Sequence, residues 1–312
     1  MNVSYSETKQ FIACQRKWFF KNKLASWNAR DATRREAFVL SKLQSLSAWR
    51  GSLVDGILSD YVIPRLQSRA AMSLDEALRL ARSRFIEQRD FALRHRVREA
   101  GMRVSQHGKS FAAWHDLEYG APPGAEALEQ NWSEIEVALR NAFGMIELFD
   151  SLRQSKVIAQ PRLTCQVDAM TISANPDVIA FGRNRTVRIV DWKVHFFGAR
   201  AAKDQLALYA GVLNRGASPY SYPFDPRAQS VDTYILTEAQ LLQGQAFDYA
   251  VTDDDVDEVF DDIFSAAQLM ELASEGEEVS VASAQHYPVT RWVEACGRCS
   301  FKKICREGGV SQ

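Results

Sequence analysis

The sequence predicts an α/β protein in which helices flank a mixed β-sheet core and a large helical region precedes that core. Apolar residues recur at helical spacing through most of residues 1–155. Strand-like runs separated by turn residues fill 156–195, and a helix and two further strands follow up to residue 250. An acidic helix at about 253–275 and a cysteine-rich segment complete the chain. We therefore expect three parts, 1–155, 156–250 and 251–312.

Four helical stretches are expected in the first part. The first begins at Ser4 or Ser6 and runs through "ETKQFIACQRKWFFKNKL". The third opens where Ser73 is followed by Glu76, the pattern of a capping box, and should continue until the breaker cluster "GAPPG". The last three stretches are expected over about 33–67, 73–119 and 125–154.

Composition is that of an ordinary globular protein, with 46% hydrophobic and 25% charged residues among 312. No apolar stretch approaches the roughly 18 to 20 residues that span a bilayer. The first twenty residues also lack the apolar core and cleavage site of a signal peptide. A cytoplasmic location without membrane contact is expected. The five cysteines are then expected as metal ligands, free thiols or core residues rather than disulfides.

Charge is distributed unevenly although the net charge is only -1. Residues 1–50 hold ten Lys or Arg against three acids, and 79–109 is again rich in arginine. Residues 251–290 hold eleven acids and no Lys or Arg. This division is compatible with a basic groove for nucleic acid beside an acidic face, with 79–109 as a wall along the backbone. Ordinary solvated helix faces are the alternative interpretation.

A carboxylate and an ammonium follow the apolar run in "TVRIVDWKV". Residues two apart in a strand share a face, so Asp191 and Lys193 should project side by side. Asp177 starts the preceding run, "NPDVIAF", and would join them at one sheet edge if the two runs pair antiparallel. Neighbouring carboxylates favour a cation such as Mg²⁺ or Mn²⁺ between them. A surface salt bridge at the strand end is the alternative.

The wider pattern resembles the RecB-like branch of the PD-(D/E)XK nucleases. Pro176-Asp177 is followed by the D-x-K of Asp191 and Lys193, and then by Gln205 and Tyr209 in "DQLALYA". The resemblance implies a restriction-endonuclease-like fold in which both aspartates bind metal and the lysine assists the attacking water. It also implies that the helix of Gln205 and Tyr209 supports the site and the DNA, and their spacing of four places them on one helix face.

An upstream motif of the same family, G-x-x-x-H, ends in a histidine that binds the metal. Here Gly51 is followed by Asp55 in the position of that histidine. An aspartate can also bind Mg²⁺, so the resemblance assigns Asp55 to the metal with an altered affinity or preference. Asp55 as an ordinary acid on a helix surface is the alternative.

Three cysteines lie close together near the C-terminus, in the pattern C-x₂-C-x₅-C. A metal site built from Cys296, Cys299 and Cys305 needs one more ligand, and Cys14 is a candidate from the opening helix. Both zinc and an iron–sulfur cluster accept four thiolates. The division into one and three cysteines resembles a subset of the same nucleases, including CRISPR-associated and helicase-partnered exonucleases, and so implies a structural [4Fe–4S] cluster. Cys165 is expected in the core.

Together these patterns predict a Mg²⁺- or Mn²⁺-dependent deoxyribonuclease acting on single strands or duplex ends. The resemblance also implies a helicase or another repair or defence protein as a partner. A non-catalytic subunit of the same fold, which binds DNA or scaffolds such a complex, is the alternative, and the departure at Asp55 is the sequence feature that favours it.

Overall fold

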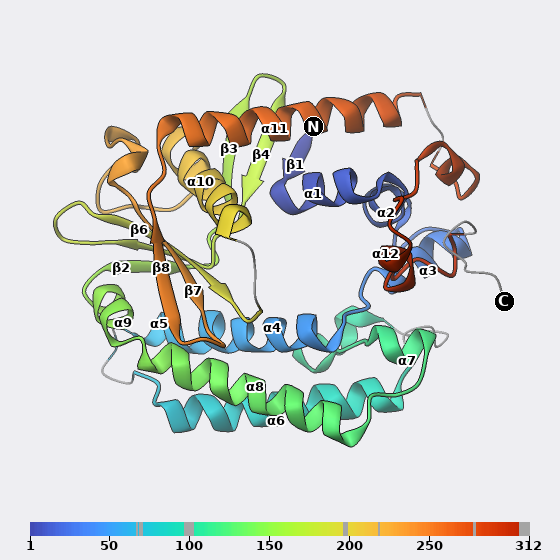
Figure 1. Ribbon diagram of the computed structural model, residues 1–312, viewed down its shortest axis with the longest axis horizontal. Helices are drawn as coiled ribbons and strands as arrows, with labels where there is room; N and C mark the ends of the chain where they lie inside the picture. The colour runs from blue at the N-terminus through green and yellow to red at the C-terminus, as the bar shows by residue number, and fades with distance from the viewer. Residues whose placement is uncertain are drawn as a thin grey trace. The chain divides into compact units, whose positions relative to one another are not determined.

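A computed structural model describes residues 1–66, 68, 71–96, 103–195, 199–217, 219–276 and 279–305 (Figure 1). The chain divides into two compact units, each assembled from three separate segments. We call the first the sheet unit, formed by 1–5, 47–85 and 125–263. The second is the cysteine unit, formed by 6–46, 86–124 and 264–312. Each unit is therefore held together by contacts between residues far apart in the sequence.

A five-stranded mixed sheet forms the core of the sheet unit. Its strand order is β2-β5-β6-β7-β8, with β6 and β7 parallel and the other neighbours antiparallel. The inner strands β5 and β6 are buried along almost their whole length, as expected for strands covered on both faces. The bounds are β2 Lys156–Ala159, β5 Val178–Phe181, β6 Val187–Lys193, β7 Ile235–Gln240 and β8 Gln245–Tyr249. The predicted mixed α/β class is confirmed.

A second sheet of the same unit has the order β1-β4-β3. Its strands are β1 Asn2–Ser4, β3 Leu163–Val167 and β4 Met170–Ala174. The parallel pairing of β1 with β4 brings the first residues of the chain beside residues 171–173. The sequence indicated a helix start at Ser4 or Ser6 and gave no sign of this strand, because three residues are too few to show a period.

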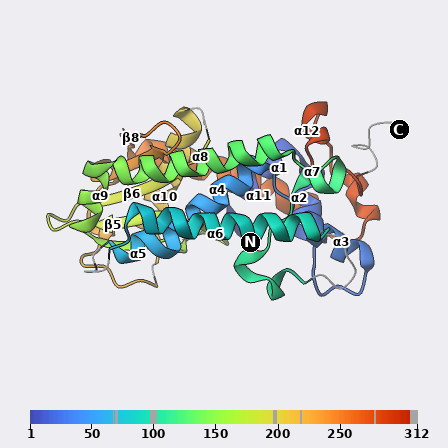
Figure 2. The ribbon, with the colours of Figure 1, turned by 90° about the horizontal axis from the view of Figure 1, so that it is seen from below.

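Helices of the sheet unit pack on both sheets. Helix α10 (Ala199–Arg215) contacts β3, β4, β6 and β7, and Figure 1 shows it lying across the strands. The others are α4 Leu46–Ile57, α5 Ile63–Arg65, α8 Ala125–Gly144 and α9 Ile146–Arg153, together with the first part of α6 Leu74–Arg94. Trp49 stacks on Phe85 at 4.8 Å between ring centroids, and Phe85 meets Trp132 at 5.4 Å, so these rings join α4, α6 and α8. Figure 2 shows the ribbons of these three helices next to one another.

The third helical stretch is shorter than predicted. Its capping box is confirmed, since the Ser73 amide donates to Glu76 at 2.9 Å and the Glu76 amide donates to the Ser73 hydroxyl at 3.2 Å. The helix ends at Arg94, however, and among the residues described after it the short turns 104–106 and 108–110 precede α7 (His115–Tyr119). Gly108 has a φ of +49°, a left-handed conformation that interrupts a helix. Arg98, in the arginine-rich segment, lies outside the described residues.

An aromatic core organises the cysteine unit. Phe11 meets Trp18 edge to face at 5.0 Å, and Phe19 stacks on Tyr287 at 4.4 Å. The buried Arg16 guanidinium donates to the Tyr287 carbonyl at 2.9 Å, which ties the opening helices to the C-terminal segment. The helices here are α1 Tyr5–Ala13, α2 Gln15–Phe19, a π-helical turn Phe20–Leu24, α3 Ala32–Leu40 and α12 Val293–Gly297.

The predicted acidic helix is confirmed as α11, Asp253–Ser274. Within the part of the chain that the structure describes, no helix is long and apolar enough to cross a membrane. Helix α11 approaches α10 closely at Gly211, where an added Cβ would lie 2.4 Å from Val256 Cγ1 and 2.8 Å from Phe260 Cε2.

Gly211→Ala is therefore expected to destabilise the protein by about 1 to 3 kcal/mol, because a methyl group must push the two helices apart. Gly144→Ala is the matched control, since a Cβ at that helical position would meet nothing within 4 Å. There the loss of backbone freedom in the unfolded chain favours alanine by roughly 0.5 kcal/mol. Urea unfolding of both variants measures the difference, and equal stabilities would contradict the close packing.

Candidate active site

The pairing of β5 with β6 brings Asp177 and Asp191 together. The register places Val178 opposite Val190, so the residue before β5 faces the end of β6. An Asp177 carboxylate oxygen accepts a hydrogen bond from the Trp192 amide at 2.7 Å. The antiparallel arrangement expected from the sequence is present, and it arises from a hairpin with only five residues between its strands.

Asp191, Lys193, Gln205 and Tyr209 form one hydrogen-bonded network. The Lys193 ammonium is ion-paired with Asp191 and donates to the Gln205 side-chain oxygen at 2.9 Å. The Gln205 amide donates to the Tyr209 hydroxyl at 2.5 Å and approaches Asp191 at 3.4 Å. Asp191 is 4% exposed and Lys193 is 9% exposed, so the pair is held away from water. Helix α10 supplies Gln205 and Tyr209 one turn apart, on the side that meets β6.

Asp55 reaches the same network from α4. One of its carboxylate oxygens accepts from the Gln160 side chain at 2.7 Å. The other oxygen is buried and has no hydrogen-bond partner among the described residues. Gly51 lies one helical turn before Asp55, and a Cβ there would meet nothing within 4 Å. Asp55 thus carries an unused oxygen, and the helix beside it faces open space.

Burial and mutual repulsion dominate the electrostatics of the three carboxylates. Burial, followed by the charges of Asp191 and Asp55, raises the pKa of Asp177 well above its usual range. Burial also raises the pKa of Asp191, against the opposing charge and hydrogen bond of Lys193. Burial raises the pKa of Asp55 to about 6, and the charges of Asp60 and Asp191 act in the same direction. Three neighbouring acids whose pKa values are all raised, chiefly by burial and in part by nearby carboxylates, form a site that favours positive charge.

Asp55→Asn tests this repulsion in the metal-free protein. The folded protein binds the Asp55 proton more tightly than the unfolded chain does, so this residue's contribution to stability is lost as the pH rises from about 4 through 6. Asparagine keeps an oxygen for Gln160 and carries no charge. In EDTA at pH 7.5 we expect the variant to be more stable than wild type, by on the order of 1 to 2 kcal/mol, and at pH 5 the difference should shrink.

Denaturant unfolding at the two pH values measures this effect. Asp75→Asn, at an exposed aspartate near the start of α6, serves as the control for the loss of a charge. A destabilised Asp55→Asn variant at pH 7.5 would contradict repulsion among the three carboxylates.

Three further residues belong to the site although the sequence did not identify them. Glu238 lies beside Asp191 in the parallel register of β6 and β7, is 1% exposed, and accepts from the Tyr249 hydroxyl at 2.7 Å. Gln160 holds Asp55 from a backbone with a φ of 43°, rare for a residue other than glycine. Arg50 is ion-paired with Glu134 and donates to the Val194 carbonyl at 2.9 Å, just beyond Lys193. The lone acid in the apolar run "YILTEA" is the signal that could have identified Glu238.

The four cysteines of the expected cluster belong to the cysteine unit. Burial raises the pKa of the Cys299 and Cys296 thiols, and the charges of Cys14 and Cys305 contribute to both shifts. The Cys14 sulfur accepts from the Lys17 amide and the Cys299 sulfur accepts from the Phe301 amide, each at 3.4 Å. Cys14, far upstream in the sequence, is therefore close enough to influence Cys296 and Cys299. Cys165 is buried in β3 of the sheet unit, as expected for a core residue.

Neither the three carboxylates nor the four cysteines are arranged to enclose a metal ion in this structure. Among the residues that the structure describes, no three His, Cys, Asp or Glu side chains are placed to hold one. At the carboxylates the donors are engaged elsewhere, because Asp177 accepts from the Trp192 amide and Asp191 is paired with Lys193. The oxygen donor set still suits Mg²⁺ or Mn²⁺, and the unpartnered Asp55 oxygen provides a ready ligand.

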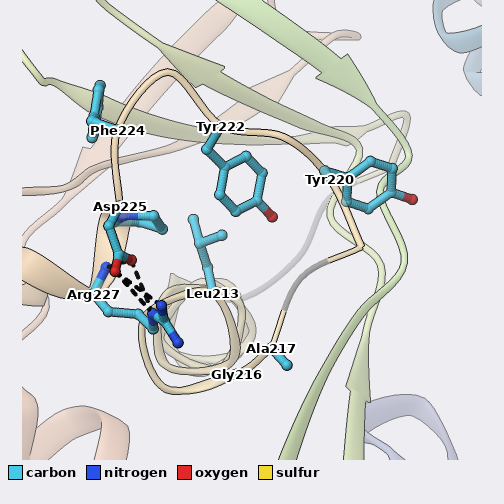
Figure 3. A pocket seen from close by; sticks show the side chains of 9 residues that line it. Leu213, Gly216, Ala217, Tyr220, Tyr222, Phe224, Asp225 and Arg227 are labelled. Carbon is cyan, nitrogen blue, oxygen red and sulfur yellow. Dashed lines mark hydrogen bonds and ion pairs between the residues drawn. The ribbon is translucent and has the colours of Figure 1, made fainter.

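A separate cavity of about 440 Å³ lies at the C-terminal end of α10 (Figure 3). Tyr220, Tyr222 and Phe224 line it, with the ion pair of Asp225 and Arg227 at its edge. It shares no residue with the carboxylate network, so it is not part of the candidate active site.

Comparison with known proteins gives one match over nearly the whole chain. The sequence pattern of the PD-(D/E)XK nuclease superfamily matches residues 2–306. No protein with a curated description matches. Among solved structures, the one titled "Crystal structure of SSO0001" is 13% identical, with 74% of this chain and 98% of that chain covered and a TM-score of 0.32.

Proposed function

Because the chain belongs to the PD-(D/E)XK nuclease superfamily, we propose that it is a metal-dependent deoxyribonuclease whose active site is the network around Asp191 and Lys193. The observation that carries the proposal is the grouping of three acids, Asp55, Asp177 and Asp191, around a buried ion pair between Asp191 and Lys193. An acidic cluster of this kind is costly to the folded protein unless a cation compensates it.

Asp55, Asp177 and Asp191 would hold one or two Mg²⁺ or Mn²⁺ ions. A divalent cation bound there would supply positive charge to the scissile phosphate and would make a neighbouring water more acidic. An ion held by Asp191 would compete with Lys193 for this carboxylate and would leave the ammonium available to the substrate. The resemblance to the RecB-like branch also assigns Asp55 the place of a histidine ligand, so a preference between the two metals that differs from the usual one is expected.

Lys193 has the central role among the chain's own residues. Its ammonium can orient the attacking water and offset the charge that develops on the phosphate. Gln205 accepts a hydrogen bond from this ammonium and fixes its direction, while Tyr209 in turn accepts from Gln205. Arg50 and the backbone bond from the Leu241 amide to the Lys193 carbonyl, at 2.8 Å, hold the end of β6 in place.

The four cysteines are proposed to hold a [4Fe–4S] cluster with a structural role. Cys14 and Cys305 both act electrostatically on Cys296 and Cys299, and the sulfurs of Cys14 and Cys299 accept backbone hydrogen bonds. Four thiolates suit such a cluster, with zinc as the other occupant of the same donor set. The cluster would tie the opening helices to the last described residues.

A non-catalytic scaffold is the second candidate. The sequence feature that favours it is Asp55 in place of histidine. Against it, a non-catalytic subunit would not require a buried lysine that is paired with Asp191 and oriented by Gln205. Catalysis is therefore the preferred function. A helicase or another repair or defence protein as a partner stays a prediction from the resemblance.

Anaerobically purified protein, incubated with end-labelled single-stranded and duplex DNA, tests the proposed function. We expect cleavage with Mg²⁺ or Mn²⁺ and none with EDTA, and the ladder of products distinguishes exonuclease from endonuclease action. Binding of DNA without cleavage under every metal condition would favour the scaffold instead.

A further inference from the structure

Lysines line one cavity of the cysteine unit. The cavity measures about 450 Å³, and its wall combines residues of the opening helices, the turn after α3 and the C-terminal segment. Its polar lining consists chiefly of Lys9, Lys17, Lys21, Ser6, Ser41 and Ser300. Ammonium and hydroxyl groups are donors that can all face an anion. No residue of the carboxylate network takes part.

The lysines come from three successive helical elements. Lys9 lies on α1, Lys17 on α2 and Lys21 on the π-helical turn that follows. Lys42, just after α3, adds a fourth charge, because it acts on Lys21. Partial desolvation of the ammonium, followed by repulsion from Lys17 and Lys42, lowers the pKa of Lys21, although the side chain as a whole is exposed.

One acid nearby, Glu7, offsets part of this charge. Glu7 acts on Lys21 in the opposite direction, and its carboxylate accepts from the Trp18 indole at 3.0 Å. The charge of Lys17 also opposes the effect of burial that raises the pKa of Cys299, so one of the four lysines acts on the thiols as well. An excess of positive charge remains around the cavity, and like charges held together favour a ligand with several negative charges.

We propose that this lysine-lined cavity binds the phosphate backbone of a DNA strand. The inference rests on the proposed function and adds a binding site for the substrate away from the carboxylate network. We favour a strand over a single small anion because the lysines come from three successive helical elements and line one wall region of the cavity together, so that neighbouring phosphates of one strand could each meet an ammonium. Contacts to phosphates carry no sequence information, so the site would position DNA of any sequence.

Lys17→Gln/Lys21→Gln tests the site against the matched pair Arg30→Gln/Lys303→Gln. Both pairs remove two charges from exposed or half-buried side chains of the cysteine unit, and the second pair lies outside the cavity. Binding is measured by fluorescence anisotropy with a labelled oligothymidylate in EDTA, where metal-dependent cleavage cannot take place. Thermal unfolding of each variant establishes that it is folded.

The lysine pair should bind the oligonucleotide roughly tenfold more weakly than wild type. The slope of log affinity against log salt should become shallower by about 1.4, since each lost contact to a single strand removes about 0.7. The control pair should change both quantities much less. Inorganic tripolyphosphate, titrated separately, distinguishes a free phosphate ligand from a strand.

Equal losses in the two pairs, or no loss in either, would overturn the site. Binding of tripolyphosphate at the lysines without binding of the oligonucleotide would overturn the strand as its ligand. These outcomes are independent of the nuclease assay. Cleavage by wild type together with unchanged binding by the lysine pair would leave the proposed function standing and remove only this inference.

Discussion

Asp191→Asn and Lys193→Met are each expected to lower the rate of DNA cleavage by a factor of about a thousand or more, because each removes a group proposed to act on the reacting phosphate. Gel assays with Mg²⁺ on end-labelled DNA measure the rate. Asp168→Asn and Lys156→Met are matched controls, since both residues are exposed and lie elsewhere on the sheet unit. Asp168 has a φ of 50°, a conformation that asparagine also tolerates.

Folding has to be separated from catalysis in this experiment. Removing one partner of the buried Asp191–Lys193 pair leaves an uncompensated charge, which can cost roughly 3 to 5 kcal/mol. The double variant Asp191→Asn/Lys193→Met leaves no such charge and should regain much of the stability while remaining inactive. Cleavage by a folded double variant at the wild-type rate would show that the active site lies elsewhere.

If the proposed metal centre is present, Cys299→Ser is expected to remove it together with most of the stability of the cysteine unit. Wild type purified without oxygen should be brown and should contain about four iron atoms per chain. The variant should be colourless and should lose several kcal/mol of unfolding free energy, because binding of a structural metal is coupled to folding. Iron and zinc analysis, visible absorption and denaturant unfolding are the measurements.

Cys165→Ser is the matched control for this prediction. Cys165 is a buried thiol of β3 in the sheet unit, so its loss should leave iron content and colour unchanged. Stoichiometric zinc without iron in wild type would replace the cluster by a zinc site. Absence of both metals from anaerobically prepared protein would contradict any metal at these cysteines.

The local sequence was sufficient for one half of the candidate site. A short hairpin and the two-residue period of a strand predict that Asp177, Asp191 and Lys193 share one end of the sheet, and the pairing of β5 with β6 places them there. Gln205 and Tyr209 are four residues apart on a helix and therefore share a face, which the structure turns toward Asp191. Side chains repeat their direction every two residues in a strand and every 3.6 residues in a helix. Which nearby residues share a face can therefore be predicted from the sequence alone.

The other half of the candidate site could be located only from the tertiary structure. Asp55 reaches the network from a helix more than a hundred residues upstream, through Gln160 in a left-handed conformation that no residue pattern announces. Glu238 comes beside Asp191 because β7 pairs parallel with β6 after a long crossover. The lysine-lined cavity forms only when the opening helices meet Ser300. Each of these contacts depends on which distant parts of the chain pack together. Packing is determined by burial of apolar surface in the whole core and not by a local repeat in the sequence.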